Sequence, residues 1–242
     1  MKISIIIPVY NEFPTLNRVL ERVALARLPD GCSKEVIVVD DGSTDGTAQA
    51  LGEQSRSGLV VAHHSAVNQG KGAALRIGIG LASGEIVLIQ DGDLEYDPND
   101  YAAMVLPILR GEADVVYGSR FRGAPHGMAL KNRIANHILT ATANVLYGAR
   151  LTDEATAYKA FRAPALKQLR LQCRRFEFCP EVTAKLRRLG YAIHEEPISY
   201  NARGIGEGKK IRARDGIQAL WTLVKYRFAT RRSLVNTGYA DG

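Results

Sequence analysis

Residues 85–95 read EIVLIQDGDLE, and this stretch decides the fold. Residues 85–90 are an apolar, β-branched run with the length of a buried strand, and the Asp-Gly pair that follows ends it. Asp91, Asp93 and Glu95 therefore collect at the carboxyl end of a strand, where open α/β sheets bind ligands. Carboxylates this close repel one another unless a cation lies between them. We predict a Mg²⁺ or Mn²⁺ site, because both ions take oxygen ligands and can bridge a diphosphate.

The same stretch has two other interpretations. An isolated Asp-x-Asp is more often a solvated acidic turn than a metal site, so the context must decide. A calcium-binding helix-loop-helix is excluded, because counting from Asp91 places its required Gly at Tyr96 and its final Glu at Ala102.

The N-terminal residues predict another buried strand followed by polar groups. Residues 3–10 are mostly apolar and end near Pro8, and Glu12 leads into an amphipathic helix over residues 15–28. Tyr10, at the end of this strand, offers a flat ring on which a base can stack.

A second strand, residues 35–39, runs directly into Asp40 and Asp41, and Ser43 or Thr44 is placed to cap the next helix. Strand, helix and strand in this order imply a right-handed crossover and a parallel sheet. Carboxylates at strand ends can accept hydrogen bonds from ribose hydroxyls or a base N–H. The sequence therefore favours a nucleotide site, although acidic strand ends also serve as plain helix caps.

A glycine-spaced loop follows the third predicted strand, residues 59–64, and opens a helix that ends near residue 82. Gly70 and Gly72 let backbone amides approach an anion, and Lys71 adds positive charge. The ordinary alternative is a plain loop. It is not the dinucleotide fingerprint, because Leu75 stands where the third glycine belongs. His63 and His64, at the end of that strand, should face core and solvent alternately.

The second half of the chain continues the alternation of strands and helices. We predict a helix to about residue 109, a strand over 113–118, a helix over 133–149, an extended segment at 197–200 and a helix over 215–228. The fold class is thus α/β, with a mixed, mostly parallel sheet flanked by helices. Asp153 and Glu154 lie among small residues, as in the wall of a site. Residues 203–210 form a glycine-spaced basic loop suited to closing over phosphates.

Two of these helices carry apolar stripes whose partner the sequence leaves open. Residues 133–149 repeat apolar side chains at helical spacing, which can dock against the core or lie on a membrane; we expect core docking. Residues 215–228 carry a second stripe bordered by Lys and Arg, which can cap the domain or rest on an anionic bilayer.

Composition sets the class of protein. With 242 residues and 46% hydrophobic content, the chain can bury a large core. No apolar run approaches the roughly 18–20 residues that cross a bilayer, and no signal peptide is visible, so we expect a cytoplasmic protein. The three cysteines lack metal-site spacing, which argues against a disulfide framework or zinc.

The formal net charge of +7 lies in the C-terminal part of the chain. Residues 1–184 carry 20 basic and 20 acidic side chains, whereas residues 185–232 carry 12 basic and 4 acidic ones. This favours a phosphate-bearing substrate or an anionic membrane surface; we expect no nucleic acid, because no nucleic-acid-binding motif is present. We divide the chain into a catalytic domain, residues 1–210, and a basic amphipathic segment and tail, residues 211–242.

Together these motifs resemble the inverting family 2 glycosyltransferases of the GT-A fold, and among them the dolichyl-phosphate mannose or glucose synthases. The matching segments are Pro8-Val9-Tyr10-Asn11-Glu12, Val38 to Asp45, Asn68 to Gly72, Asp91-Gly92-Asp93, Gly118-Ser119-Arg120, and Arg203 with Gly206 to Lys210. Their order over nearly 210 residues makes a chance match improbable.

The resemblance implies roles for individual residues. The nucleotide-binding set is Pro8, Tyr10, Glu12, Asp40 and Asp41, to which the loop chemistry adds Lys71 and the acidic motif adds Asp91. The metal set is Asp91, Asp93 and Glu95, the last at a position where many members have Gln. The phosphate and acceptor set is Arg120, Arg133, Arg203 and Lys209, with Lys131 competing for the role of Arg133. The catalytic set is Asp91, Asp93, Arg120 and Asp153.

The expected reaction is transfer of a hexose from a nucleotide-diphosphate sugar, of the GDP-mannose or UDP-glucose type, to a polyprenyl phosphate with inversion. A phosphate acceptor is largely dianionic at neutral pH and needs no protein base. A sugar hydroxyl acceptor would need one, and Asp153 or Glu154 are the candidates. The basic C-terminal segment favours the phosphate and a place at the cytoplasmic membrane face.

Three alternatives stay open. One is a soluble family 2 enzyme that acts on a saccharide hydroxyl, and another is a non-catalytic nucleotide-sensing module. A sugar nucleotidyltransferase shares the acidic metal site, but it would need a Gly-rich basic loop directly after the first strand, and residues 8–12 supply none.

Overall fold

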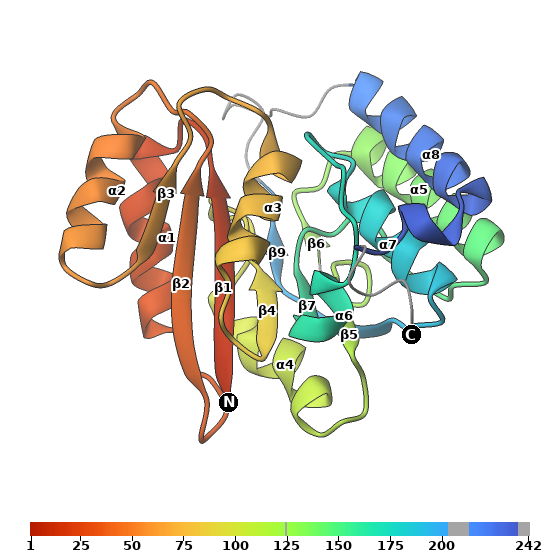
Figure 1. The fold of residues 1–242 in the computed structure, drawn as a ribbon, viewed down its shortest axis with the longest axis horizontal. Helices are drawn as coiled ribbons and strands as arrows, with labels where there is room; N and C mark the ends of the chain where they lie inside the picture. The colour runs from red at the N-terminus through yellow and green to blue at the C-terminus, as the bar shows by residue number, and fades with distance from the viewer. Residues whose placement is uncertain (124, 203–212, 237–242) are drawn as a thin grey trace.

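The computed structural model describes residues 1–123, 125–202 and 213–236. Its main feature is a mixed sheet covered by helices on both faces (Figure 1). The strands are β1 (Lys2–Val9), β2 (Ser33–Asp40), β3 (Val61–His64), β4 (Ile86–Ile89), β5 (Val115–Ser119), β6 (Pro125–His126), β7 (Lys159–Arg162), β8 (His194–Pro197) and β9 (Tyr200–Asn201). The helices are α1 (Phe13–Leu25), α2 (Thr47–Arg56), α3 (Lys71–Leu81), α4 (Tyr101–Leu109), α5 (Leu130–Tyr147), α6 (Ala163–Lys167), α7 (Phe178–Arg188) and α8 (Ala213–Phe228), with short 3₁₀ turns η1 (Pro98–Asp100) and η2 (Arg231–Ser233).

The main sheet has seven strands in the order β3-β2-β1-β4-β7-β5-β8. β7 runs antiparallel to both of its neighbours, and the other described pairs in this sheet are parallel. The prediction of a mixed, mostly parallel sheet is therefore confirmed. A separate pairing of β6 with β9 forms a second, two-stranded sheet.

The strand β1 shows why this sequence forms a central strand. Its side chains alternate between the two faces, with Ile3, Ile5 and Ile7 in one apolar cluster and Ile6 in the other. Helices α1, α2 and α4 cover the first face, and α3, α6 and α7 cover the second. Because both faces are covered, the strand is mostly apolar instead of alternating regularly with polar residues; Ser4 is its one buried polar side chain.

The topology brings the polar loops together at the carboxyl ends of the parallel strands, which form one edge of the sheet. The strands β1, β2, β4 and β5 all end at this edge, and β7 begins there because it runs the opposite way. The loops after these ends hold the acidic and basic motifs that the sequence singled out.

Two local predictions were wrong. Helix α2 begins at Thr47 after Gly46, and Asp45 accepts its first backbone N–H at 3.1 Å, so neither Ser43 nor Thr44 caps it. His63 and His64 do not alternate between core and solvent. Their strand β3 is the outermost strand of the sheet, so His63 is partly exposed and His64 is exposed.

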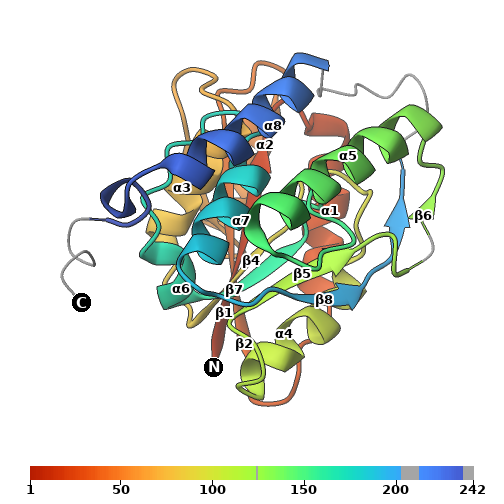
Figure 2. The same ribbon diagram turned by 90° about the vertical axis from the view of Figure 1, so that its right-hand side faces the viewer.

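A third group of helices, α5, α7 and α8, packs together beside the sheet through a cluster that includes Ala143, Ala184, Leu223 and Tyr226 (Figures 1 and 2). The expectation that the stripe of α5 docks against the core was wrong, because its side chains are exposed. The proposed boundary at residue 210 lies outside the described residues. Among the helices that the structure describes, none is long and apolar enough to cross a membrane.

Candidate functional site

The loops after β1 and β2 are fastened to each other at the sheet edge. Asn11 has a φ of 50°, a left-handed conformation that asparagine tolerates better than most residues. Its backbone N–H donates to the hydroxyl of Ser43, and its side-chain oxygen accepts from the backbone N–H of Thr44, both at 2.8 Å. The carboxylate of Asp45 also accepts from the N–H of Phe13 at 3.1 Å. These hydrogen bonds hold the two loops, which carry most of the predicted nucleotide-binding residues, in a fixed position relative to each other.

At the end of β1, Pro8 is buried within the strand, opposite Val39 of β2, and Tyr10 is partly exposed just beyond the strand. Glu12 is 8% exposed, and its carboxylate accepts a hydrogen bond from the hydroxyl of Thr15 at 2.8 Å. The partial exposure of the Tyr10 ring suits the stacking role that the sequence suggested.

Asp40 is fully buried and shapes the turn after β2. One carboxylate oxygen accepts hydrogen bonds from the backbone N–H of Ser43, at 3.1 Å, and from its hydroxyl. The other oxygen pairs with Nδ1 of His64, whose side chain is 53% exposed. The structure thus brings an exposed imidazole to the site, a contact that the sequence did not reveal.

Asp41 joins this turn to the loop before α3. Its two carboxylate oxygens accept backbone N–H groups from Gln69 at 2.9 Å and from Gly70 at 2.7 Å. Burial raises the pKa of Asp41, although these two hydrogen bonds act in the opposite direction. Asp41 therefore fixes the position of the loop that carries Lys71.

The glycines of this loop serve chain packing. A Cβ at Gly70 would collide with the carbonyl oxygen of Arg174, and one at Gly72 with that of Arg175. The N–H groups of Gly72 and Ala73 donate to these carbonyls, at 2.8 Å to Arg175 and 3.0 Å to Arg174. These amides are already used within the protein, so in this structure they do not offer the anion site that the glycine spacing suggested.

Lys71 instead points at the acidic motif, where its ammonium forms an ion pair with the carboxylate of Asp91. The side chains are 26% and 16% exposed. The main chain of Asp91 is held as well, because its carbonyl accepts from the amide of Gln90 at 3.0 Å, and Gln90 accepts from Tyr101 at 2.9 Å. The acidic motif is therefore anchored to the core and reached by a cation of the protein itself.

The three acidic side chains of this motif do not form one ligand group. No set of three His, Cys, Asp or Glu side chains among the described residues is placed to hold a metal ion. Asp93 accepts the backbone N–H of Glu95 at 3.1 Å, and Glu95 accepts from the hydroxyl of Tyr200 at 3.0 Å. Two carboxylates still fit Mg²⁺ or Mn²⁺, because such ions often use one or two carboxylates and complete their shell with substrate phosphates and water. Asp91 and Asp93 supply the suitable hard oxygen atoms.

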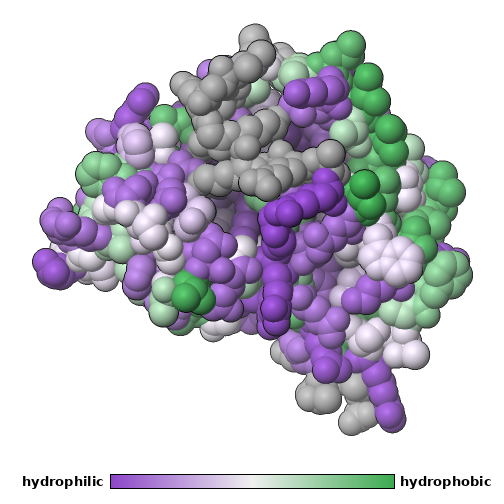
Figure 3. All heavy atoms as spheres, turned by 90° about the horizontal axis from the view of Figure 1, so that it is seen from above, coloured by the Kyte–Doolittle hydropathy of each residue, from purple (hydrophilic) through white to green (hydrophobic). Residues whose placement is uncertain are grey.

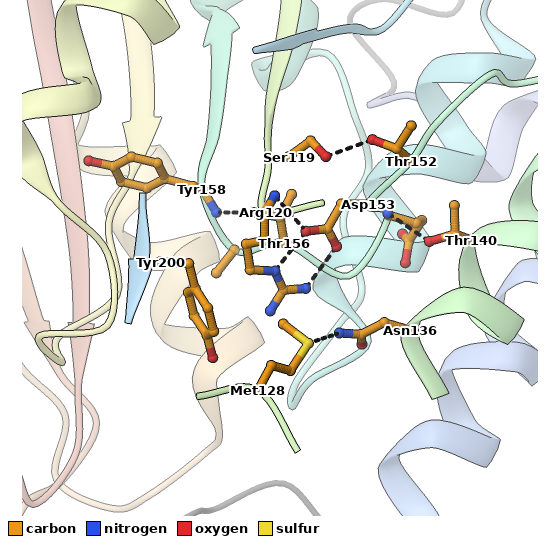
Figure 4. Close-up of polar contacts among 12 residues, drawn as sticks. Ser119, Arg120, Met128, Asn136, Thr140, Thr152, Asp153, Thr156, Tyr158 and Tyr200 are labelled. Atoms are coloured by element: carbon orange, nitrogen blue, oxygen red, sulfur yellow. Dashed lines mark hydrogen bonds and ion pairs between the residues drawn. The ribbon is translucent and has the colours of Figure 1, made fainter. Parts of the chain in front are cut away.

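Arg120, which follows β5, is held by Asp153 in a buried bidentate pair (Figure 4). Nε and Nη2 of Arg120 donate to the two carboxylate oxygens at 2.7 and 2.8 Å, and the Arg120 backbone N–H donates at 3.0 Å. The Arg120 side chain is 8% exposed and that of Asp153 is 0% exposed. The ring of Tyr200 lies 5.1 Å from the guanidinium carbon. This geometry fixes the guanidinium and leaves N–H donors for an anion.

The loop that carries Asp153 is itself tied down by Glu195 of β8, a residue that the sequence analysis missed. The Glu195 carboxylate accepts the backbone N–H of Thr152 at 2.9 Å and that of Asp153 at 3.0 Å. On the other side, the hydroxyl of Thr140 in α5 accepts the N–H of Glu154 at 3.0 Å. Because basic residues predominate in residues 185–232, the sequence did not point to Glu195 as a buried acid. The pairing of β8 with β5 places it beside the loop of Asp153.

Glu154 lies beneath the site. It is fully buried; its Oε1 accepts from the hydroxyl of Thr183 at 3.0 Å, and its Oε2 has no hydrogen-bond partner among the described residues. Lys159, also fully buried, donates to the Glu154 carbonyl at 2.9 Å and lies 3.4 Å from the ring centre of Tyr117. Burial raises the pKa of Glu154 and lowers that of Lys159.

A cluster of tyrosines supports the acidic loop, and no sequence pattern predicted it. Tyr96 stacks on Tyr158 with ring centres 5.1 Å apart, and Tyr200 lies 5.3 Å from Tyr96. Beside this cluster is a cavity of about 640 Å³, whose lining includes Glu95 and Tyr200. Tyr200 thus contacts both the acidic loop and Arg120, and it joins the two halves of the site.

The remaining predicted residues lie away from these contacts or outside the described residues. Arg133 and Lys131 are both exposed in the first turns of α5. Arg203 and Lys209 lie outside the described residues. The structure therefore brings together the residues after β1, β2, β4 and β5 with Asp153.

Comparison with known proteins agrees with this fold and identifies the family. Residues 4–170 match the family model described as Glycosyl transferase family 2. Because the match spans more than half of the chain, the chain belongs to glycosyl transferase family 2. The family resemblance stated from the sequence motifs is confirmed.

Two curated relatives are similar in sequence. The chain is 31% identical over 214 residues to dodecaprenyl-phosphate galacturonate synthase of Rhizobium johnstonii. This match covers 86% of this chain and 62% of the relative. It is 30% identical over 221 residues to undecaprenyl-phosphate mannosyltransferase of Micrococcus luteus, which covers 86% of this chain and 87% of the relative. The chain therefore spans less than two thirds of the Rhizobium protein.

Among solved structures, the chain resembles glucosyl-3-phosphoglycerate synthase from Mycobacterium tuberculosis, in a complex with Mn²⁺, uridine diphosphate and glucosyl-3-phosphoglycerate. The TM-score is 0.71, the sequence identity is 24%, and the match covers 93% of this chain and 79% of that one. This likeness confirms the GT-A type of fold.

Proposed function

We propose that this chain transfers a hexose from a nucleotide-diphosphate sugar to a polyprenyl phosphate, with inversion at the anomeric carbon. The observation that carries the proposal is the buried Arg120–Asp153 pair at the same sheet edge as Asp91, which joins a fixed cation to an acidic motif. The names of the two relatives, which both denote transfer involving a polyprenyl phosphate, support this choice of acceptor.

The donor would bind at the ends of β1, β2 and β4. We propose that Pro8, Tyr10, Glu12, Asp40 and Asp41 form the nucleotide site. Asp91 and Asp93 would hold Mg²⁺ or Mn²⁺, which supplies positive charge where the departing diphosphate develops negative charge. Lys71, which already pairs with Asp91, brings a further positive charge to that place.

The acceptor phosphate would act as the nucleophile. It is largely dianionic at neutral pH, so an oxygen of the phosphate can attack the anomeric carbon directly. A new carbon–oxygen bond forms there as the bond to the nucleotide diphosphate breaks, and its electron pair leaves with the diphosphate oxygen. Arg120 would bind one of the phosphate groups, and Arg133, Arg203 and Lys209 are proposed to bind the acceptor.

The geometry also bears on the role of Asp153. A general base must reach the proton that it removes. Both carboxylate oxygens of Asp153 accept hydrogen bonds from Arg120, and Glu154 is fully buried. This arrangement favours a phosphate acceptor over a sugar hydroxyl, and we propose that Asp153 orients Arg120.

We also propose a division of labour along the chain. Residues 1–210 would form the catalytic unit, and the basic residues 211–242 would help to hold the protein at the cytoplasmic face of a membrane. The net positive charge of residues 185–232 supports this arrangement.

A transfer assay tests the proposal. The purified chain is incubated with radiolabelled GDP- or UDP-sugars, Mg²⁺ or Mn²⁺, and either detergent-solubilised polyprenyl phosphate or free saccharides. We expect label in the organic-solvent extract, and none after Asp91→Asn. Asp114→Asn serves as the matched control, because Asp114 lies at the far end of β5 and its side chain is 47% exposed. Label found only in water-soluble saccharide, or no turnover of any donor, would reject the proposal.

A further inference from the structure

Helix α5 exposes its apolar stripe and buries a different face. Leu130, Ile134, Ile138 and Val145 recur at helical spacing and are 71%, 51%, 53% and 83% exposed. The buried positions of this helix are Thr140 and Ala143, which lie on another side. A helix that only covers a core would show the opposite pattern, with its large apolar side chains inside.

Helix α8 also exposes an apolar stripe, although its inner side is apolar as well. Ile217, Trp221, Val224 and Phe228 form a stripe on its outer side and are 71%, 65%, 37% and 81% exposed. The inner side of the helix packs into the protein through buried residues, which include Ala219, Leu223 and Tyr226.

The two stripes belong to one surface, because α5 and α8 lie side by side (Figures 1 and 2). Figure 3 shows hydrophobic side chains gathered along this part of the molecule. Of the fifteen large hydrophobic side chains that are exposed in the described residues, eight lie on these two helices. We name this surface the α5–α8 face and define it by Leu130, Ile134, Ile138, Val145, Ile217, Trp221, Val224 and Phe228.

The charge around the α5–α8 face has one sign. The only acidic residue in Leu130–Tyr147 and Ala213–Phe228 is Asp215, which is 4% exposed. The same helices carry five basic residues, and two more follow in η2: Lys131, Arg133, Arg214, Lys225, Arg227, Arg231 and Arg232. Apolar side chains bordered by Lys and Arg are typical of a surface that lies on an anionic bilayer. A second copy of this face would bring like charges together, which argues against self-association.

We propose that the α5–α8 face rests on an anionic lipid bilayer. Its apolar side chains would enter the boundary between headgroups and acyl chains, and its Lys and Arg side chains would meet the headgroup phosphates. Each basic side chain near the surface adds to this attraction, so several together strengthen the binding.

This surface is connected to the candidate site through a single helix. On the inner side of α5, Thr140 accepts the N–H of Glu154, and Asn144 bonds both backbone groups of Leu151, so α5 carries the loop with Asp153. A helix with its side chains is roughly 10–12 Å across, so the loop that α5 carries lies only about one helix diameter from the α5–α8 face. This link to catalysis rests on the proposed function: a polyprenyl phosphate embedded in that bilayer would present its phosphate close to Arg120.

Trp221 makes the proposal directly testable, because it is the only tryptophan of the chain and lies on the α5–α8 face. The full chain is mixed with vesicles of phosphatidylglycerol and phosphatidylcholine, without donor or acceptor. We expect a blue shift of the tryptophan emission, quenching by brominated lipids, and co-sedimentation that weakens as salt screens the charges. Vesicles of phosphatidylcholine alone should bind more weakly.

A pair of double variants separates the face from general surface effects. Ile138→Glu with Phe228→Glu should lower the vesicle partition coefficient by about tenfold or more, because it adds negative charge to the exposed face that would enter the bilayer. Leu25→Glu with Leu59→Glu is the matched control, since these side chains are 75% and 62% exposed on other elements. Thermal unfolding shows that each variant is folded.

Three results would overturn the proposal: no emission shift with anionic vesicles, equal loss of binding in both double variants, or a blue shift that follows dimerisation in the absence of lipid. Because vesicle binding is measured without any turnover, its outcome is independent of the transfer assay. An active enzyme that does not bind vesicles would reject only this proposal. Vesicle binding by a chain that transfers no sugar would reject only the proposed function.

Discussion

Arg120 and Asp153 form the buried ion pair on which the acceptor side of the proposed site depends. A second Asp–Arg pair in the chain, Arg162 with Asp114, has nearly the same distance of 2.8 Å, but its side chains are 35% and 47% exposed. Desolvation makes the two pairs very different in energy, since a buried charge that loses its partner has no water to replace it.

We therefore predict that Asp153→Asn lowers the free energy of unfolding by about 3–5 kcal/mol, because it leaves the Arg120 guanidinium buried and uncompensated. Asp114→Asn should change it by less than about 1 kcal/mol. Denaturant unfolding of both variants measures the two values. Equal, small losses would show that the Arg120 guanidinium does not depend on Asp153.

The buried carboxyl group of Glu154 should make the stability of the folded protein depend on pH. Burial raises its pKa above the ordinary 4.5, so the folded protein keeps a proton that the unfolded chain has already released. Stability should therefore fall as pH rises from about 4.5 through the raised pKa, with a slope of at most about 1.4 kcal/mol per pH unit. Above the raised pKa the slope disappears.

Glu154→Gln should remove this contribution, because an amide does not titrate. The test is the difference between the melting temperatures of the two proteins over a range of pH. We expect Glu154→Gln to gain stability relative to the natural protein as pH rises through this window. A difference that stays constant with pH would contradict the raised pKa.

At the scale of elements, the last parallel strand of the sheet acts on the site through Glu195. Its carboxylate binds two successive backbone N–H groups of the loop before β7, and that loop presents Asp153 to Arg120. Glu195 of β8 thus positions the Arg120 guanidinium indirectly, through the loop that carries Asp153.

Glu195→Gln should destabilise this loop by about 1–3 kcal/mol, because a neutral amide accepts hydrogen bonds more weakly than a carboxylate and its NH₂ group would replace the second oxygen, which also accepts the N–H of Thr152. Glu196→Gln is the matched control, since Glu196 follows in the same strand and pairs with His194 near the surface. Hydrogen exchange at the amides of Thr152 and Asp153 should become faster only in the first variant. Unchanged protection there would show that the loop is held by other contacts.

At the scale of the whole molecule, the sheet gathers charges of both signs at the carboxyl ends of its strands, where Lys71 pairs with Asp91 and Arg120 pairs with Asp153. A ligand that binds only the native state raises its stability by mass action. UDP or GDP together with Mn²⁺ should therefore raise the melting temperature more than either component alone.

Asp91→Asn should abolish the extra increase that Mn²⁺ gives with the nucleotide, and Asp114→Asn should preserve it. Differential scanning fluorimetry of the three proteins is sufficient. If Mn²⁺ adds the same increase in all three, the cation binds away from the acidic motif.

Much of the fold was predictable from local sequence. The apolar runs that form β1, β2 and β4 carry strand signals that survive any context, because both faces of a central parallel strand are buried. The acids and glycines that follow β2 and β4 end these strands at the same edge, so Asp40 and Asp91 were expected near one another, whereas the role of Arg120 came only from the family resemblance. The stripes of α5 and α8 were also visible, but periodicity alone could not say which side of a helix faces solvent.

The sequence by itself determined the α/β class, the strands β1 to β5 and the chemistry collected at their carboxyl ends, since these follow from residue periodicity and turn residues over short distances. The short antiparallel strand β7 was not predicted. Only the tertiary structure decided that Lys71 pairs with Asp91, that Glu195 holds the loop of Asp153, and that the α5–α8 face is exposed. Each of these contacts joins residues that are far apart in the chain, and their pairing depends on how the whole sheet and its helices pack. Local propensity contains no information about such distant partners.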